Sequence, residues 1–238
     1  PWGFESVVEG GEVPSVSVRF MERLVEKAEA LGLLRHPHIV RLVGYHRHIP
    51  LLVYEYAPYG SLEWQLERGW DPSLGVALLV GLQVGDALRY IHSRGLVHGD
   101  IKPGNVFIGG ERWAKVGDFS GLVRLLSKSS RSAMPRQYTL GFRAPEQVFS
   151  DLRERAKAAG LENRIDVYQL GNLILYLATG DTVDGEEYTE ADEKLAEIRD
   201  PRLQGLLRLM LAKDPLERPG IEQVLPRLAE IYRTIAIK

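Results

Sequence analysis

The chain has 238 residues, 45% of them apolar, and is long enough to bury the core of one domain or of two small lobes. Its formal net charge of −2 sets up no field that would attract nucleic acid or an acidic membrane surface, and the absence of cysteine excludes disulfides, a thiolate nucleophile and a Cys-ligated metal. The longest apolar runs, such as residues 75–82, fall well short of the ~18 residues of a membrane span.

No signal peptide is visible, so we expect a cytoplasmic protein without nucleic-acid or membrane partners. Because the chain opens on Pro1 rather than on Met, we also expect a piece of a longer protein. Few asparagines and many Arg, Glu and Leu residues are typical of heat-adapted sources. The oligomeric state has no signature in the sequence.

Two short strands are expected near the N-terminus, on either side of Gly10-Gly11, and a helix is expected over residues 21–34. Apolar residues at positions 21, 24, 25, 28 and 31 have the spacing of an amphipathic helix. Glu26 and Glu29 lie three residues apart on that helix and therefore share a face, which a charged solvent face would explain equally well.

Histidines cluster at residues 36–48, where His-x-His spacing raises the question of a metal site. A turn before a strand and a hairpin tip after it explain these histidines better. Residues 51–56 then read as a buried strand, and Ser61 caps a helix that begins after a turn. A long helix is expected over residues 72–92, with apolar or small residues every three or four positions on its buried side.

The chemistry of the chain is concentrated in residues 98–108 and 117–120. Residues 106–108 and 113–116 read as two strands of a hairpin around Gly109-Gly110, which would bring Asn105 and Asp118 together at one end. Both offer hard oxygen ligands for Mg²⁺. Asp100 can orient a hydroxyl nucleophile and take its proton, and Lys102 can neutralise charge on a transferred phosphoryl group. An Asp-rich turn would explain a lone His-x-Asp, but not this full set at this spacing.

The rest of the chain is mainly helical. Residues 122–138 are polar, basic and rich in serine, which is typical of a mobile loop. Residues 151–163 read as an extra charged helix, and the acidic residues 181–200 carry no motif.

The stretch His98-Gly99-Asp100-Ile101-Lys102-Pro103-Gly104-Asn105 with Gly117-Asp118-Phe119 resembles the catalytic and metal-binding loops of the protein kinase family. The resemblance implies an α+β, bilobal fold. A small, truncated, β-rich N-lobe would span residues 1–56 and lack its first strand, and a larger, mainly helical C-lobe would span residues 57–238, the two forming one kinase domain. The small lobe is divergent, as in a prokaryotic or archaeal member.

The resemblance also implies ATP and Mg²⁺ as cofactors and a protein Ser/Thr hydroxyl as the acceptor, with Asp100 and Lys102 catalytic and Asn105 and Asp118 binding metal and nucleotide. Thr139 and Lys102 match the Ser/Thr-specific branch. The run 139–146 resembles the segment that docks a peptide substrate, and serines 127, 129, 130 and 132 are candidate phosphorylation sites.

In the small lobe, the resemblance makes Gly3 the one remaining glycine of the phosphate-covering loop. It places Arg19 where the family has a lysine that contacts the nucleotide phosphates, with Glu26 or Glu29 as a partner of Arg19. Tyr54 would lie at the back of the nucleotide pocket, and the backbone of Glu55 and Ala57 would face adenine.

Two further residues have supporting roles by resemblance: Asp166 would accept backbone N–H groups of the catalytic loop, and Arg218 would pair with Glu146. Gly99 replaces an arginine that receives an activation-loop phosphate, so switching by that route should be weak or absent. Ser120 replaces a glycine and would restrict its loop.

The sequence therefore supports a Ser/Thr protein kinase as the first hypothesis. The second is a pseudokinase-like module that binds nucleotide or acts as a scaffold with weak or no transfer, motivated by the lost glycines, Arg19 and Ser120. Phosphotransfer to a small molecule is disfavoured by the peptide-docking run at 139–146.

Overall fold

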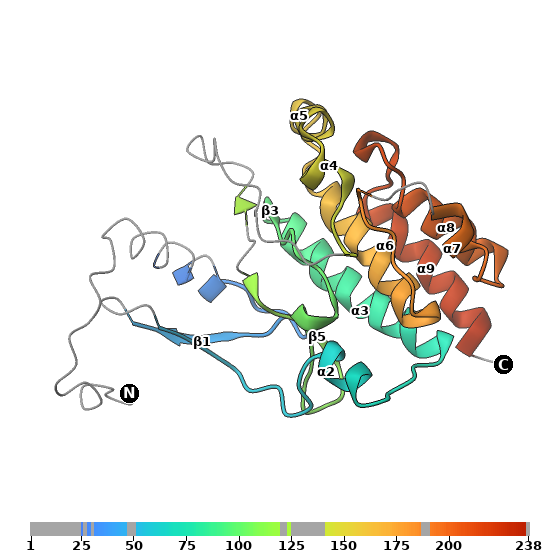
Figure 1. The fold of residues 1–238 in the computed structure, drawn as a ribbon. Helices are drawn as coiled ribbons and strands as arrows, with labels where there is room; N and C mark the ends of the chain where they lie inside the picture. Colours follow the sequence, from blue (N-terminus) through green and yellow to red (C-terminus); the bar gives the residue numbers. More distant parts are fainter. Residues whose placement is uncertain are drawn as a thin grey trace. The chain divides into compact units, whose positions relative to one another are not determined.

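The structure is a computed structural model that describes residues 25, 28–29, 31–46, 51–119, 123–124, 141–186 and 191–236 (Figure 1). The chain divides into two compact units. The smaller comprises Pro1–Arg35 and Arg41–Glu55, and the larger comprises His36–Val40 and Tyr56–Lys238. The expected lobe boundary between residues 56 and 57 stays a prediction. The division into compact units changes at residues 55 and 56 and also assigns residues 36–40, which the sequence places in the smaller lobe, to the larger unit.

The smaller unit contains the hairpin β1 (Leu42–Tyr45) and β2 (Leu52–Tyr54), which pair antiparallel with an irregularity between Leu42 and Gly44. The expectation of a buried strand at 51–56 was wrong in extent and burial, because β2 is three residues long and Val53 at its centre is exposed. The described residues of the helix expected over 21–34 are helical at 25, 28, 29, 31 and 32, and Ala28 and Leu31 are buried, as the apolar spacing requires.

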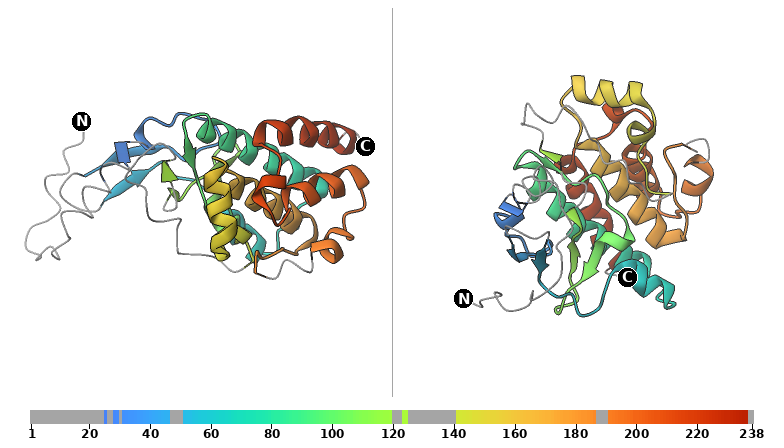
Figure 2. Two further views of the ribbon diagram at one scale, coloured as in Figure 1. Left: turned by 90° about the horizontal axis from the view of Figure 1, so that it is seen from above. Right: turned by 60° about the vertical axis from the view of Figure 1, so that its left-hand side comes forward.

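The core of the larger unit is built around α3 (Leu74–His92), which packs against α6 (Arg164–Thr179) and α9 (Ile221–Ala236) (Figures 1 and 2). Close approach of these helices depends on small residues. A Cβ at Gly81 would lie 2.7 Å from Ile174 Cγ1, and one at Gly85 would lie 2.7 Å from Leu225 Cδ2. A larger residue at either position would therefore clash with a side chain of a neighbouring helix.

Helix α3 is also long and apolar enough to cross a membrane by length and composition. However, more than half of the window that meets this test is buried inside the protein, against α6 and α9. The core helix of a folded domain explains this pattern.

Two short antiparallel strand pairs flank residues 98–105 in the sequence. Strand β4 (Val106–Ile108) pairs antiparallel with β5 (Ala114–Val116), as predicted, and β3 (Leu96–Val97) pairs with β6 (Val123–Arg124). The segment 36–40 joins this region, because Val40 N donates to Val116 O at 2.8 Å and Val116 N donates to His38 O at 2.9 Å.

The remaining described elements are short helices in the larger unit. They are α2 (Leu62–Glu67), the 3-10 turn η1 (Pro103–Asn105), α4 (Pro145–Val148), α5 (Ser150–Ala158), α7 (Ala191–Leu195), α8 (Pro201–Met210) and the 3-10 turn η4 (Pro215–Glu217).

Local capping explains several of their ends. Ser61 Oγ accepts a hydrogen bond from Trp64 N at the start of α2, as predicted. The charged helix expected over 151–163 is real but shorter, since α5 ends before Gly160, whose φ of 66° is the left-handed conformation that stops a helix.

Candidate active site

The loop between β3 and η1 is held by buried side chains rather than by a backbone ladder. Asp166, in the first turn of α6, accepts hydrogen bonds from His98 N at 3.0 Å and from Gly99 N at 2.7 Å. It also accepts one from His92 Nε2 at 2.7 Å. The expected role of Asp166 is thereby confirmed. Burial opposes ionisation of Asp166, but the hydrogen bonds that it accepts from His92 and Gly99 outweigh burial and lower its pKa.

The first catalytic candidates lie together on this loop. Lys102 Nζ is 3.1 Å from Asp100 Oδ2, and Asn105 Nδ2 donates to Asp100 Oδ2 at 2.9 Å and to the Asp100 carbonyl at 2.8 Å. The carboxylate of Asp100 is therefore oriented by one cation and one amide, while 14% of its side chain stays accessible to solvent. A largely covered carboxylate that keeps some access to solvent can accept a proton from a bound hydroxyl.

His98 is buried completely and acts as a brace for this loop. Its Nδ1 accepts from Asp100 N at 3.3 Å, so the proton of the neutral ring is on Nε2, which donates to Gly117 O at 3.1 Å. Burial lowers the pKa of His98 against the attraction of Asp166. The neutral ring connects the Asp100 loop to the end of β5.

The position of Asp118 follows from the β4–β5 hairpin. Val106 pairs with Val116, and Gly117 N donates to Asn105 O at 2.9 Å, so Asp118 is the residue directly after a backbone bond to Asn105. Asp118 is exposed and has a φ of 46°, a left-handed conformation that is uncommon outside glycine but that Asp and Asn adopt more readily than other residues.

The donor set of Asn105 and Asp118 fits Mg²⁺. Asn105 donates to Asp100 through Nδ2 and so keeps Oδ1 as a possible ligand, and Asp118 directly follows Gly117, whose N–H donates to Asn105 O. No group of three or more His, Asp or Glu side chains that could hold a metal occurs among the described residues. Mg²⁺ does not need one, because it is usually bound by one or two protein oxygens together with phosphates and water.

Other predicted site residues are placed differently. Gly3, Arg19, Glu26, Ser120, Thr139 and serines 127, 129, 130 and 132 lie outside the described residues, and Glu29 is exposed on its helix. In the predicted adenine-facing segment, Glu55 N donates to Arg41 O at 2.9 Å within the smaller unit. The carbonyl oxygen of Ala57 accepts from Gly60 N at 3.2 Å, so the predicted role of Ala57 would fall to its backbone N–H.

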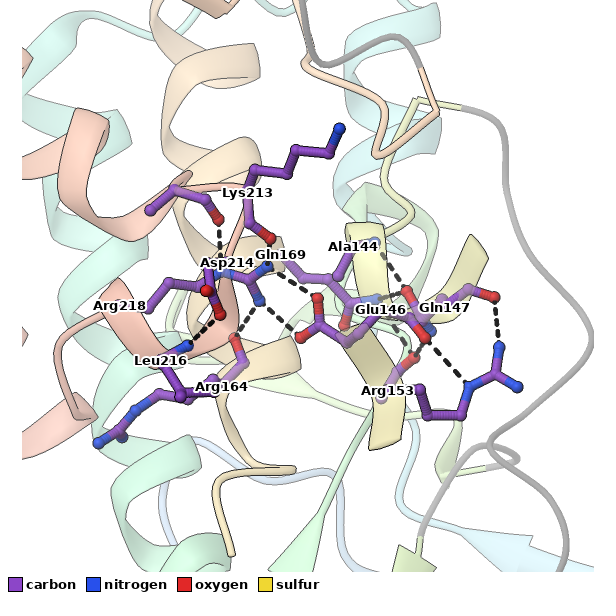
Figure 3. A network of polar contacts seen from close by, with 12 residues as sticks. Ala144, Glu146, Gln147, Arg153, Arg164, Gln169, Lys213, Asp214, Leu216 and Arg218 are labelled. Atoms are coloured by element: carbon purple, nitrogen blue, oxygen red, sulfur yellow. Dashed lines mark hydrogen bonds and ion pairs between the residues drawn. The ribbon is translucent and has the colours of Figure 1, made fainter. Parts of the chain in front are cut away.

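A buried ion pair joins α4 to the residue after η4. Arg218 donates to both carboxylate oxygens of Glu146, at 2.6 and 2.7 Å, and both side chains are fully buried (Figure 3). Further donation to the carbonyl oxygens of Arg164, Ala212 and Lys213 satisfies the guanidinium. The pairing expected from the sequence is confirmed.

Sequence reasoning missed several buried polar residues around residues 141–147. Gln147 and Gln169 hydrogen-bond to each other and to the carbonyl oxygen of Gly99. Asn172 hydrogen-bonds to the backbone of Gly141 and Val183. Asp184 accepts hydrogen bonds from Arg143 and from Gly141 N. Asp184 comes from the acidic stretch in which no motif was seen. The only available signal was a polar residue at a core-facing position of α6, for Gln169 and Asn172.

Comparison with known proteins gives a consistent result. The model of the protein kinase domain family matches residues 14–227. The interferon-induced, double-stranded RNA-activated protein kinase of Mus musculus is 32% identical over 191 residues, covering 77% of this chain and 35% of that protein. The probable serine/threonine-protein kinase PBL4 of Arabidopsis thaliana is 31% identical over 242 residues, covering 88% of this chain and 57% of that protein.

The receptor-like kinase TMK4 of Arabidopsis thaliana is 28% identical over 245 residues, covering 98% of this chain but 24% of that protein. The chain thus spans about a third or less of the first curated relatives that it matches. The family model covers most of the chain, and the described residues form a small unit with a β-hairpin and a larger helical unit that carries the Asp100 loop. This chain belongs to the protein kinase domain family.

Proposed function

We propose that this chain is a Ser/Thr protein kinase that transfers the γ-phosphoryl group of ATP to serine or threonine hydroxyls of a protein substrate. The observation that carries the proposal is the orientation of the Asp100 carboxylate by Lys102 at 3.1 Å and by Asn105 at 2.9 Å, in a loop held by buried Asp166. In phosphoryl transfer the protein contributes mainly positioning and charge stabilisation, and this set supplies both.

In the proposed reaction, Asp100 orients the acceptor hydroxyl and takes its proton as the oxygen–phosphorus bond forms. Lys102 stabilises negative charge on the transferred group, and Oδ1 of Asn105 and the carboxylate of Asp118 would hold Mg²⁺. When bound, Mg²⁺ neutralises the phosphate oxygens and fixes the orientation of the nucleotide. ATP and Mg²⁺ are what a protein kinase domain implies.

Preference for Ser and Thr is supported by Lys102, two residues after Asp100, and by the relative PBL4, whose name gives that specificity. The alternative of a pseudokinase-like module that only binds nucleotide is not favoured by the comparisons. The assay below must still distinguish this module from an active kinase, because Arg19 stands where the family has a lysine.

The test is incubation of the wild type with radiolabelled ATP, Mg²⁺ and a panel of protein substrates, beside Asp100→Asn and Arg19→Lys. We expect phosphoserine or phosphothreonine from the wild type and a rate about 10²–10⁴-fold lower from Asp100→Asn. A faster Arg19→Lys would show that the small lobe limits the rate. A thermal shift with ATP and Mg²⁺ but no transfer to any protein would overturn the proposal in favour of a binding module.

A further inference from the structure

The two residues that flank Asp100 are bound by a single side-chain amide. Gln169, on α6, accepts from Ile101 N at 2.9 Å through Oε1 and donates to Gly99 O at 3.2 Å through Nε2. A carboxamide offers an acceptor and two donors in one plane, so one glutamine can bind an N–H and a C=O of the same loop. Asp100 lies between these two attachment points.

Gln147, on α4, binds the same loop and the same glutamine. Its Nε2 donates to Gly99 O at 3.0 Å, while its Oε1 accepts from Ala144 N at 2.8 Å and from Gln169 Nε2 at 3.1 Å (Figure 3). The carbonyl oxygen of Gly99 therefore accepts two amide donors. A continuous chain of hydrogen bonds runs from Ala144, through both glutamines, to Ile101.

Both amides are deep in the protein, with 4% of Gln147 and 2% of Gln169 exposed. A buried amide that loses its partner costs the free energy of its lost hydration, so these contacts hold one arrangement. Gly99 supports it with a φ of 76°, a backbone conformation that most side chains would disfavour. The glycine at this position thus turns its carbonyl oxygen towards the two glutamines.

The segment at residues 141–144 is anchored at a second point, Gly141. Gly141 N donates to Asp184 Oδ2 at 2.8 Å, and Asn172 Nδ2 donates to Gly141 O at 3.0 Å. Residues 141 and 144 are consequently both bound by buried side chains of the larger unit. A displacement of this segment would be transmitted to Gly99 through Gln147.

We propose that Gln147 and Gln169 are positioning residues that couple the segment at 141–144 to the loop of Asp100, and so hold the Asp100 carboxylate in its working orientation. This inference rests on the proposed kinase activity. The junction consists of uncharged amides, so its strength does not depend on salt or on an added phosphate.

The test compares Gln169→Met and Gln147→Met, which keep side-chain length and remove the polar atoms, with Gln204→Met as the matched control. Gln204, on α8, is half-buried and donates to Leu195 O at 3.0 Å, with no contact to the Asp100 loop. We expect kcat to fall about 10–100-fold in the first two variants, because small misplacement of reacting groups has effects of that size. KM for ATP should change less than twofold, and Gln204→Met should match the wild type.

A third variant, Gln169→Glu, separates positioning from a general loss of stability. Only the protonated carboxyl can donate to Gly99 O while accepting from Ile101 N, and burial near Asp166 favours that protonated form. The ratio of its kcat to that of the wild type should therefore rise as pH is lowered from 8 to 6. A flat ratio, or kcat of both Met variants within twofold of the wild type, would overturn the inference.

Amide hydrogen exchange of the peptide 96–102 gives a readout that needs no catalysis. Exchange should speed up in Gln147→Met and Gln169→Met and stay unchanged in Gln204→Met. If the wild type transfers no phosphate, the proposed function fails, and exchange still decides whether the glutamines hold the loop. Unchanged exchange in both Met variants would overturn the positioning role.

Discussion

Arg218 and Glu146, 72 positions apart in the chain, meet through two hydrogen bonds of 2.6 and 2.7 Å with neither side chain exposed to solvent. The pair connects α4 to the segment after η4, and Arg153 and Gln147 lie beside it in the same polar network (Figure 3). Because a buried charge without a partner is far costlier than a solvated one, the two residues depend on each other.

Breaking this pair should be strongly destabilising. Arg218→Met leaves the Glu146 carboxylate buried without a cation, and we expect the free energy of unfolding to fall by about 3–5 kcal/mol in urea denaturation. Arg155→Met is the control, because its exposed ion pair with Asp214, at 2.7 Å, should contribute no more than about 1 kcal/mol. Equal losses in the two variants would contradict the importance of burial here.

Removing the cation next to Asp100 should slow transfer without weakening binding. In Lys102→Met the ammonium 3.1 Å from Asp100 Oδ2 is lost, and with it the charge proposed to stabilise the transferred group. We expect kcat to fall about 10²–10³-fold, the size of effect seen when one charge-stabilising donor is removed. Steady-state kinetics checks this, with the exposed Lys157→Met as control. A change confined to KM would argue that Lys102 acts in binding alone.

The proposed metal role of Asp118 predicts a changed Mg²⁺ requirement. Asp118→Asn keeps the shape and the left-handed backbone tendency of this residue but removes its charge. The Mg²⁺ concentration for half-maximal activity should rise roughly tenfold or more, since even indirect damage to metal sites costs about 10–100-fold in affinity. The exposed Asp71→Asn variant should titrate like the wild type. An unchanged Mg²⁺ curve would remove Asp118 from the metal site.

Stability should fall in mildly acidic solution because of His98. Its pKa is below the ordinary 6.5 in the folded protein, through burial, so the unfolded chain binds a proton that the folded one does not. Below pH 6.5 the free energy of unfolding should therefore drop, by up to about 1.4 kcal/mol per pH unit for this group. The loss ends once pH has passed below the folded pKa.

Unfolding of the wild type and of His98→Asn between pH 7.5 and 5.5 tests this, and the variant should show a shallower slope. His36, whose pKa is also lowered by burial, acts in the same window and is controlled by His36→Asn. Asp166 has a lowered pKa, so its contribution is lost only below its ordinary 3.8, outside this range. Parallel slopes for the wild type and His98→Asn would show that His98 is not the group responsible.

Several elements were predictable from local sequence. The β4–β5 hairpin follows from two short apolar runs around Gly109-Gly110, the start of α2 from a Ser61 cap, and α3 from apolar residues every three or four positions. Each signal lies within one element, so neighbouring residues were sufficient to read it. The burial of β2 was misjudged because an apolar run does not reveal which face another element covers.

By itself, the sequence determined the family, the order of the larger unit's helices and the residue types grouped at 98–118, because these depend on local pattern and on spacing along the chain. Only the tertiary structure decided which buried amides hold the Asp100 loop. Gln169 lies 68 positions from Ile101, and Gln147 lies 48 from Gly99. A glutamine carries no periodic or charge signal of its own, and its hydrogen-bond partner is chosen only when distant segments pack together and exclude water.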